Sequence, residues 1–285
     1  GKFANKITYQ KLLNTFLGKL LFGGIFCEAL TPEDISLGVL TKEGYYRYIS
    51  SPKGSGARIH HLLQELEATS YEAIRLLNPP IIQFEEIKEA YKKGDEFFSD
   101  FPNISIDLLL RGISFLIKWE WPEAIIFIWT SIEQVIDKIW KKEFVKKRTT
   151  KGVIKNRKGF LEDTRTWTAS TRIEMFYQKE FIDTSTYQLI NNIRKARNDF
   201  IHGGVMPSEN HALEGLKALL YLLSLSSTEY LIDDKLDYVY DLISERVQRG
   251  LVHERVEISD DQIDAWKEIL PIPGDESWGE KDFQK

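Results

Sequence analysis

Residues 184–204 read TSTYQLINNIRKARNDFIHGG, and this segment sets the architecture that we expect for the chain. Asp183 just before it belongs to the residue types preferred as helix N-caps. Gly203-Gly204 supplies a stop, because glycine readily takes the left-handed conformation that ends many helices. The pattern therefore predicts a long amphipathic helix over residues 184–202. Its apolar residues recur at helical spacing: Leu189, Ile190, Ile193, Ala196, Phe200 and Ile201.

An arginine, an asparagine and a histidine lie within the last two turns of this predicted helix, at Arg197, Asn198 and His202. Residues four apart share a helix face, so Asn198 and His202 are expected side by side. Arg197 falls on the edge of the apolar stripe. Because an arginine is costly to bury without a partner, we expect Arg197 to line a cleft.

The spacing from Arg197 to His202 resembles the Arg-x(4–6)-His motif of HEPN ribonucleases, where the residue after the arginine is often asparagine, as Asn198 is here. Proteins of that family are all-helical, and their motif closes a long helix just before the final bundle helix. Residues 183–228 look like that arrangement, and the resemblance covers roughly residues 100–230. It implies an all-α fold: a HEPN-like antiparallel helical bundle with a mostly helical N-terminal extension and a small C-terminal extension.

The resemblance also implies a function, that of an endoribonuclease which needs no metal or other cofactor. RNA carries its own nucleophile, the 2′-hydroxyl, so the protein must move protons and stabilise a charged phosphorane. Imidazole titrates near neutrality, which suits His202 as a general acid, and the guanidinium of Arg197 grips phosphate. Asn198 can orient His202 or donate to a phosphate oxygen. HEPN domains dimerise, so the resemblance implies a homodimer with a composite active site, and members often act as toxins or anti-phage defence effectors.

Other interpretations stay open. Arg197 can be a structural ion pair between helices, and His202 can cap the helix C-terminus. A second match runs from Arg246 to His253, but Val247 follows the arginine and Gly250 is expected to break the helix. The rival class of function is a non-catalytic HEPN-like scaffold that binds a nucleotide or a partner protein.

A basic segment lies between Lys138 and Lys158, where ten basic residues accompany one acid, Glu143. Aromatic residues interleave with these charges, which is typical of RNA-contacting surfaces. The alternative is a solvated face and a polar loop. We assign phosphate contact to six residues: Lys141, Lys142, Lys146, Lys147, Arg148 and Lys151.

The composition sets limits on these hypotheses. The chain has 285 residues and a net charge of −5, which argues against coating nucleic acid by bulk electrostatics. A single cysteine, Cys27, excludes an internal disulfide and fits a reducing compartment. No apolar run reaches membrane-spanning length, so we expect a cytoplasmic protein without a membrane partner. His60-His61 diverge on a helix, and no second ligand set stands at metal spacing, so no metal site is expected.

Three segments are expected along the chain. Residues 1–99 form an N-terminal helical module that binds a regulatory partner or ligand, residues 100–230 the bundle with the motif, and residues 231–285 an acidic extension. A threonine-proline pair predicts a helix start at 31–34, and residues 44–49 can be a strand or a loop. Residues 146–170 are expected to be a polar connection. Further helices are predicted over 7–21, 57–77, 83–98, 104–119, 123–145, 171–179, 209–225, 231–247 and 260–270, with a short strand over 251–258.

Overall fold

The computed structural model describes residues 2–35, 37–40, 46–50, 82–146, 156–226 and 233–251. Contacts along the chain define two units. One comprises residues 1–10, 30–82 and 253–285, and the other residues 11–29 and 83–252. The boundary expected between residues 99 and 100 does not coincide with this division, because the helix that ends at Ser99 groups with the bundle.

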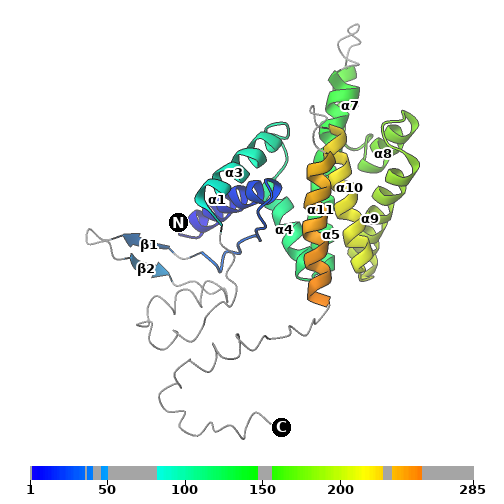
Figure 1. Cartoon of the computed structure of the whole chain (residues 1–285). Coiled ribbons are helices and arrows are strands. Elements are labelled where there is room, and N and C mark those ends of the chain that lie inside the picture. The colour runs from blue at the N-terminus through cyan, green and yellow to red at the C-terminus, as the bar shows by residue number, and fades with distance from the viewer. Residues whose placement is uncertain are drawn as a thin grey trace, which may run out of the picture. The chain divides into compact units, whose positions relative to one another are not determined.

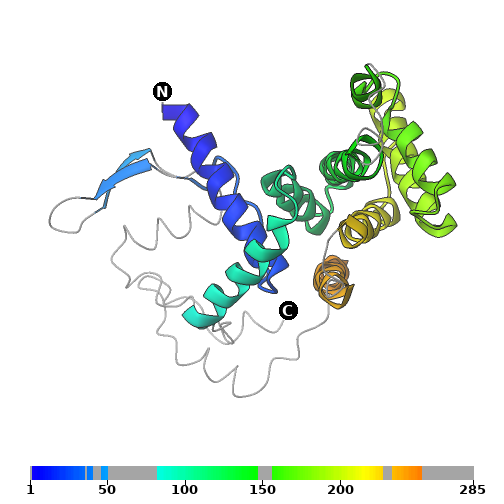
Figure 2. The ribbon, with the colours of Figure 1, turned by 90° about the horizontal axis from the view of Figure 1, so that it is seen from above.

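A four-helix bundle forms the centre of the larger unit. It consists of α4 (Ile106–Ile117), α5 (Trp121–Trp140), α10 (Glu209–Ser226) and α11 (Asp233–Leu251). Contacts run from α4 to α5, from α5 to α10, from α10 to α11 and back from α11 to α4. The four helices are therefore closed into a ring, which is seen nearly end-on in Figure 2. The prediction of a mainly helical fold is confirmed.

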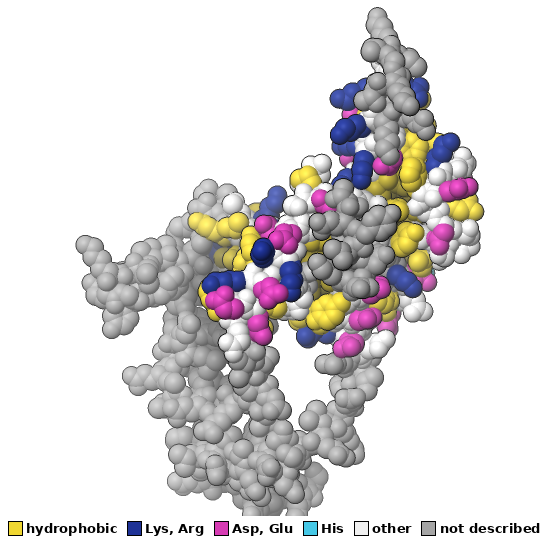
Figure 3. Space-filling model, turned by 45° about the horizontal axis from the view of Figure 1, so that its top comes forward, with side chains coloured by type: hydrophobic (Ala, Val, Ile, Leu, Met, Phe, Trp, Pro, Cys, Tyr) yellow, Lys and Arg dark blue, Asp and Glu magenta, His cyan; other side chains and the backbone are white. Residues whose placement is uncertain are grey.

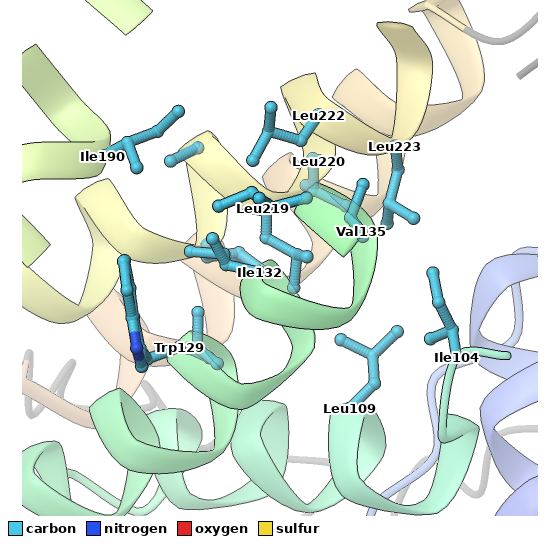
Figure 4. Packing of buried hydrophobic residues seen from close by; sticks show 14 of the residues in the cluster. Ile104, Leu109, Trp129, Ile132, Val135, Ile190, Leu219, Leu220, Leu222 and Leu223 are labelled. Atoms are coloured by element: carbon cyan, nitrogen blue, oxygen red, sulfur yellow. The ribbon is translucent and has the colours of Figure 1, made fainter. Parts of the chain in front are cut away.

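The core of this bundle is largely aliphatic. Ile128 and Ile132 on α5 are fully buried, as are Leu219 and Leu223 on α10. Figure 4 shows side chains of α5 and α10 meeting at the centre, with Leu109 of α4 and Ile190 of α9 at the sides. The predicted helix over 209–225 is nearly surrounded by neighbours, which explains why apolar residues occupy most of its circumference.

Helix α9 (Thr184–Gly203) packs on the outside of this ring against α5 and α10, and α8 (Ala169–Gln178) lies beside it (Figure 1). Thr186, Ile190, Ile193 and Ala196 form its buried face. The approach to α10 is close, because a Cβ atom added at Gly215 would lie 1.8 Å from Ile193 Cδ1. This packing fixes the rotation of α9 and so decides which polar residues face outward.

Further helical elements of the larger unit precede and extend the bundle. The part of α1 (Lys2–Phe22) in this unit packs on α3 (Phe84–Ser99), where the rings of Phe22 and Phe97 stack at 5.2 Å. Beyond Trp140 the helix α5 continues as a π-helical turn, η2 (Lys141–Lys146). The short helix α7 (Arg157–Glu162) follows in the region that was expected to be a polar connection.

In the smaller unit, β1 (Leu37–Leu40) pairs with β2 (Tyr46–Ser50) as an antiparallel hairpin. The strand alternative for residues 44–49 is therefore confirmed over residues 46–49. The predicted helix start at Thr31 is wrong. Asp34 Oδ2 accepts hydrogen bonds from the Thr31 backbone N–H and hydroxyl, both at 2.8 Å, and this closes a turn instead.

The predicted helix over 231–247 is confirmed, but the expected break at Gly250 is wrong, because α11 continues through it to Leu251. The helices predicted over 57–77 and 260–270 and most of the strand over 251–258 lie outside the described residues. Among the described helices, none is long and apolar enough to span a membrane.

Candidate functional site

Both ends of α9 form as the sequence predicts. Asp183 Oδ1 accepts the backbone N–H of Thr186 at 2.8 Å, which satisfies one of the unpaired donors of the first turn. At the other end Gly204 takes a left-handed conformation with φ of 67°, and its N–H donates to Phe200 O at 2.9 Å. These caps hold the motif residues in the final two turns of a regular helix.

Arg197 and Asn198 are joined by a direct hydrogen bond. Arg197 Nη1 donates to Asn198 Oδ1 at 3.0 Å, so the amide oxygen orients the guanidinium. Arg197 Nε is buried and has no hydrogen-bond partner within the described part of the chain. Among the same residues no carboxylate forms an ion pair with Arg197, so the structural ion pair is not observed there.

His202 is exposed in the last turn of α9. Its ring makes no hydrogen bond to the final carbonyls in the residues that the structure covers, so the capping alternative is not observed there either. Asn198 lies one turn earlier on the same face. Arg197 is five residues from His202, which at about 100° per residue puts them about 140° apart around the helix, with Asn198 between them.

The surface beside His202 is apolar. Ile201, Val205 and Met206 are exposed by 44%, 59% and 68%. Such side chains cluster where α9 ends and the connection to α10 begins. An apolar cluster of this kind around a polar site is typical of surfaces that contact another molecule.

A pocket of about 320 Å³ opens between α9, the connection at residues 205–207 and the first turn of α10. Lys195, Asp199 and His211 lie in its lining, whereas Arg197 and His202 do not. Sequence reasoning missed His211, because it stands in the next helix and belongs to no motif spacing. The signal available in the sequence was the spacing Ser208-x-x-His211 at the start of a helix. In the structure the Ser208 backbone N–H donates to His211 Nδ1 at 3.2 Å.

The basic segment is divided between surface and core. Lys141, Lys142 and Lys146 are exposed on η2, and Lys141 Nζ also pairs with Asp137 Oδ2 at 2.6 Å. Figure 3 shows Lys and Arg side chains gathered at the end of the bundle where α7 lies. The other assigned contacts lie outside the described residues, namely Lys147, Arg148 and Lys151.

The aromatic residues of this segment serve mainly as core. Trp140 and Phe144 are buried, and their rings stack at 4.4 Å, whereas Phe160 on α7 is 54% exposed. Lys138 also turns inward: its Nζ lies 3.6 Å from the centre of the Phe101 ring and donates to Ser226 O at 3.3 Å. Burial lowers the pKa of Lys138 to about 8, although the nearby Asp100 carboxylate partly opposes this shift.

Arg246, the arginine of the second motif match, packs against an aromatic ring. Its guanidinium carbon lies 3.5 Å from the centre of the Phe26 ring, and its Nε is buried. His253 and the pair His60-His61 lie outside the described residues. Within the described ranges, no group of three His, Cys, Asp or Glu side chains is arranged to hold a metal ion.

Comparisons of this chain with protein-family models, with curated proteins and with solved structures found no match.

Proposed function

We propose that this protein is a metal-independent endoribonuclease of the HEPN type, acting as a toxin or anti-phage effector. The observation that carries the proposal is the end of α9, where Arg197 is hydrogen-bonded to Asn198 and His202 is exposed one turn further on. Phosphodiester cleavage by a 2′-hydroxyl needs a cation to stabilise the phosphorane and a group that transfers protons, and the side chains of arginine and histidine suit these two roles.

The proposed reaction is an internal transfer. The 2′-oxygen attacks the phosphorus, the bond from phosphorus to the 5′-oxygen breaks, and a 2′,3′-cyclic phosphate and a 5′-hydroxyl result. His202 gives a proton to the departing 5′-oxygen, and Arg197 stabilises the charge on the phosphorane. Asn198 holds the guanidinium through its oxygen and keeps an amide nitrogen as a donor for phosphate.

A second group must accept the proton of the 2′-hydroxyl. We propose that this acceptor is His202 of a second copy of the chain, in a homodimer with a composite cleft, since the motif of one chain holds a single histidine. The exposed Ile201, Val205 and Met206 supply apolar surface for a self-complementary contact. Light scattering of an active preparation should give the mass of a dimer, and a strict monomer would rule out the shared cleft.

The test of the function is cleavage of mixed cellular RNA by the purified chain with and without EDTA. Fragments should accumulate at similar rates in both reactions, because proton transfer and charge stabilisation are assigned to side chains. Complete dependence on a divalent ion would rule out this mechanism. Nucleotide or protein binding without any cleavage would favour the scaffold alternative.

The basic segment is proposed to contact RNA phosphates. Replacing Lys146, Lys147 and Arg148 with alanine should weaken RNA binding across sequences. The slope of log affinity against log salt should flatten by roughly two to three units if all three contact phosphate. Binding is measured by fluorescence anisotropy at several salt concentrations.

The matched control is a triple alanine variant at Lys88, Lys92 and Lys93 on α3, where the same charge is removed from another surface. The salt slope of this control should stay near that of the unaltered protein. An unchanged slope in the Lys146, Lys147 and Arg148 variant would assign those residues to a solvated face.

A further inference from the structure

The lining of the pocket between α9 and α10 combines apolar side chains with polar groups that donate and polar groups that accept hydrogen bonds. Of its apolar lining residues, Ala196 and Pro207 are buried, and Val205 and Met206 are exposed. Its volume of about 320 Å³ falls within the ~300–1,000 Å³ range that is typical of small-molecule sites.

The polar groups of the pocket have defined roles as donors or acceptors. Lys195 can only donate, and the Asp199 carboxylate can only accept. His211 Nδ1 accepts the Ser208 backbone N–H at 3.2 Å, so the proton of the neutral ring sits on Nε2, which is a donor. Asn192 Nδ2 lies 3.5 Å from Glu214 Oε2, which turns this nitrogen toward Glu214.

The pocket lies on the His202 side of α9. Lys195, Asp199 and His202 are spaced i, i+4 and i+7, so they follow one another along a single helix face. At about 100° per residue, Lys195 and His202 differ by only about 20° in direction. A molecule bound in the pocket therefore lies against the face of α9 that ends at His202. Helices α9 and α10, which form its walls, lie side by side in Figures 1 and 2.

We propose that this pocket binds a guanine nucleotide. Guanine presents two adjacent donors, its N1–H and its exocyclic amine, which match the two oxygens of the Asp199 carboxylate. Adenine presents an acceptor at N1, which a carboxylate repels. Lys195 and His211 Nε2 are donors for the phosphate, and the apolar lining accepts the face of the base.

The same chemistry arises from a free nucleotide or from a guanosine within RNA. The assignment to RNA rests on the proposed ribonuclease function, and it predicts cleavage beside guanosine. The binding of a mononucleotide does not depend on that function. Binding and cleavage therefore test the two ideas separately.

The experiment titrates the full chain with GMP and with AMP by isothermal calorimetry. GMP should bind at least about tenfold more tightly, because adenine leaves the carboxylate without its two hydrogen bonds. Asp199→Asn should remove this preference and bring GMP to the affinity of AMP. Glu209→Gln removes a neighbouring carboxylate from the first turn of α10 without altering the pocket lining, so it should retain the preference. Circular dichroism checks that both variants keep their helices.

Three outcomes would overturn the guanine site. They are equal binding of GMP and AMP, no binding of GMP at millimolar concentration, and an unchanged preference in Asp199→Asn. EDTA-resistant cleavage together with any of these three outcomes would support the ribonuclease function and rule out the guanine site in this pocket. Preferential GMP binding in a chain that cleaves no RNA would support the guanine site and contradict the ribonuclease function. Cleavage beside guanosine that Asp199→Asn abolishes assigns the pocket to RNA.

Discussion

We expect His202→Ala to lower RNA cleavage by at least about 10²-fold, the scale typical of losing a general acid–base group. The imidazole is exposed at the end of α9, so its removal creates no cavity in the core. The fold, the mass of the assembly and the affinity for RNA should persist while the rate falls. Single-turnover cleavage of a labelled RNA measures the rate, and thermal unfolding checks the fold.

Arg197→Ala should lower the rate on the same scale, because the phosphorane loses its stabilising charge. Arg197→Lys should recover only part of it, since an ammonium group does not reproduce the planar fork of donors. The matched control is His253→Ala, which changes the histidine of the competing motif and should leave cleavage nearly intact. Loss of activity in His253→Ala with normal activity in His202→Ala would show that α9 is only a core element.

Trp140→Ala should reduce the free energy of unfolding by about 3–5 kcal/mol, the range for truncating a large buried aromatic side chain. Trp140 is 1% exposed, and its ring stacks on Phe144 and lies 4.8 Å from that of Trp167. Its Nε1 donates to Leu161 O at 2.7 Å, so truncation also leaves a buried acceptor unpaired. Urea unfolding followed by circular dichroism measures the loss.

Trp119→Ala is the control for this prediction, because Trp119 is 40% exposed and its Nε1 donates to Val247 O at 3.3 Å. It removes the same side chain from a half-exposed position. A smaller loss of stability is expected there. Equal losses in the two variants would contradict the assignment of Trp140 to the packing that links α5, η2 and α7.

The sequence predicted those parts of the fold that local rules determine. Asp183 and Gly204 mark the two ends of α9, because their backbone and side-chain preferences act within one turn. The helix start predicted at Thr31 also rested on a local rule, but that prediction was wrong. A threonine followed three residues later by an aspartate also fits a closed turn, and that turn formed instead of a helix.

Two other differences concern α11 and the basic segment. Gly250 stays helical in α11, although glycine weakens a helix on its own. Trp140 and Phe144 interleave with lysines in the sequence, but they lie four residues apart across the junction of α5 and η2. Both rings pack inward there, whereas Lys141, Lys142 and Lys146 are exposed.

The candidate site was predictable only in part. Arg197, Asn198 and His202 stand close together in the sequence, so their place at one helix end followed from periodicity alone. The hydrogen bond from Arg197 to Asn198 depends on side-chain rotamers, and the pocket with His211 depends on how α9 meets α10. Neither leaves a regular spacing in the sequence.

The most direct measurement is the chemistry of the RNA ends that the purified chain produces in EDTA. Attack by the 2′-hydroxyl with His202 as the acid leaves a 2′,3′-cyclic phosphate, or a 3′-phosphate after hydrolysis, and a 5′-hydroxyl. Mass spectrometry of a short RNA should detect these ends. An RNA with a single 2′-deoxy residue at the cleaved position should resist cutting there. Products with a 5′-phosphate and a 3′-hydroxyl, or cleavage of the deoxy substrate, would contradict the account.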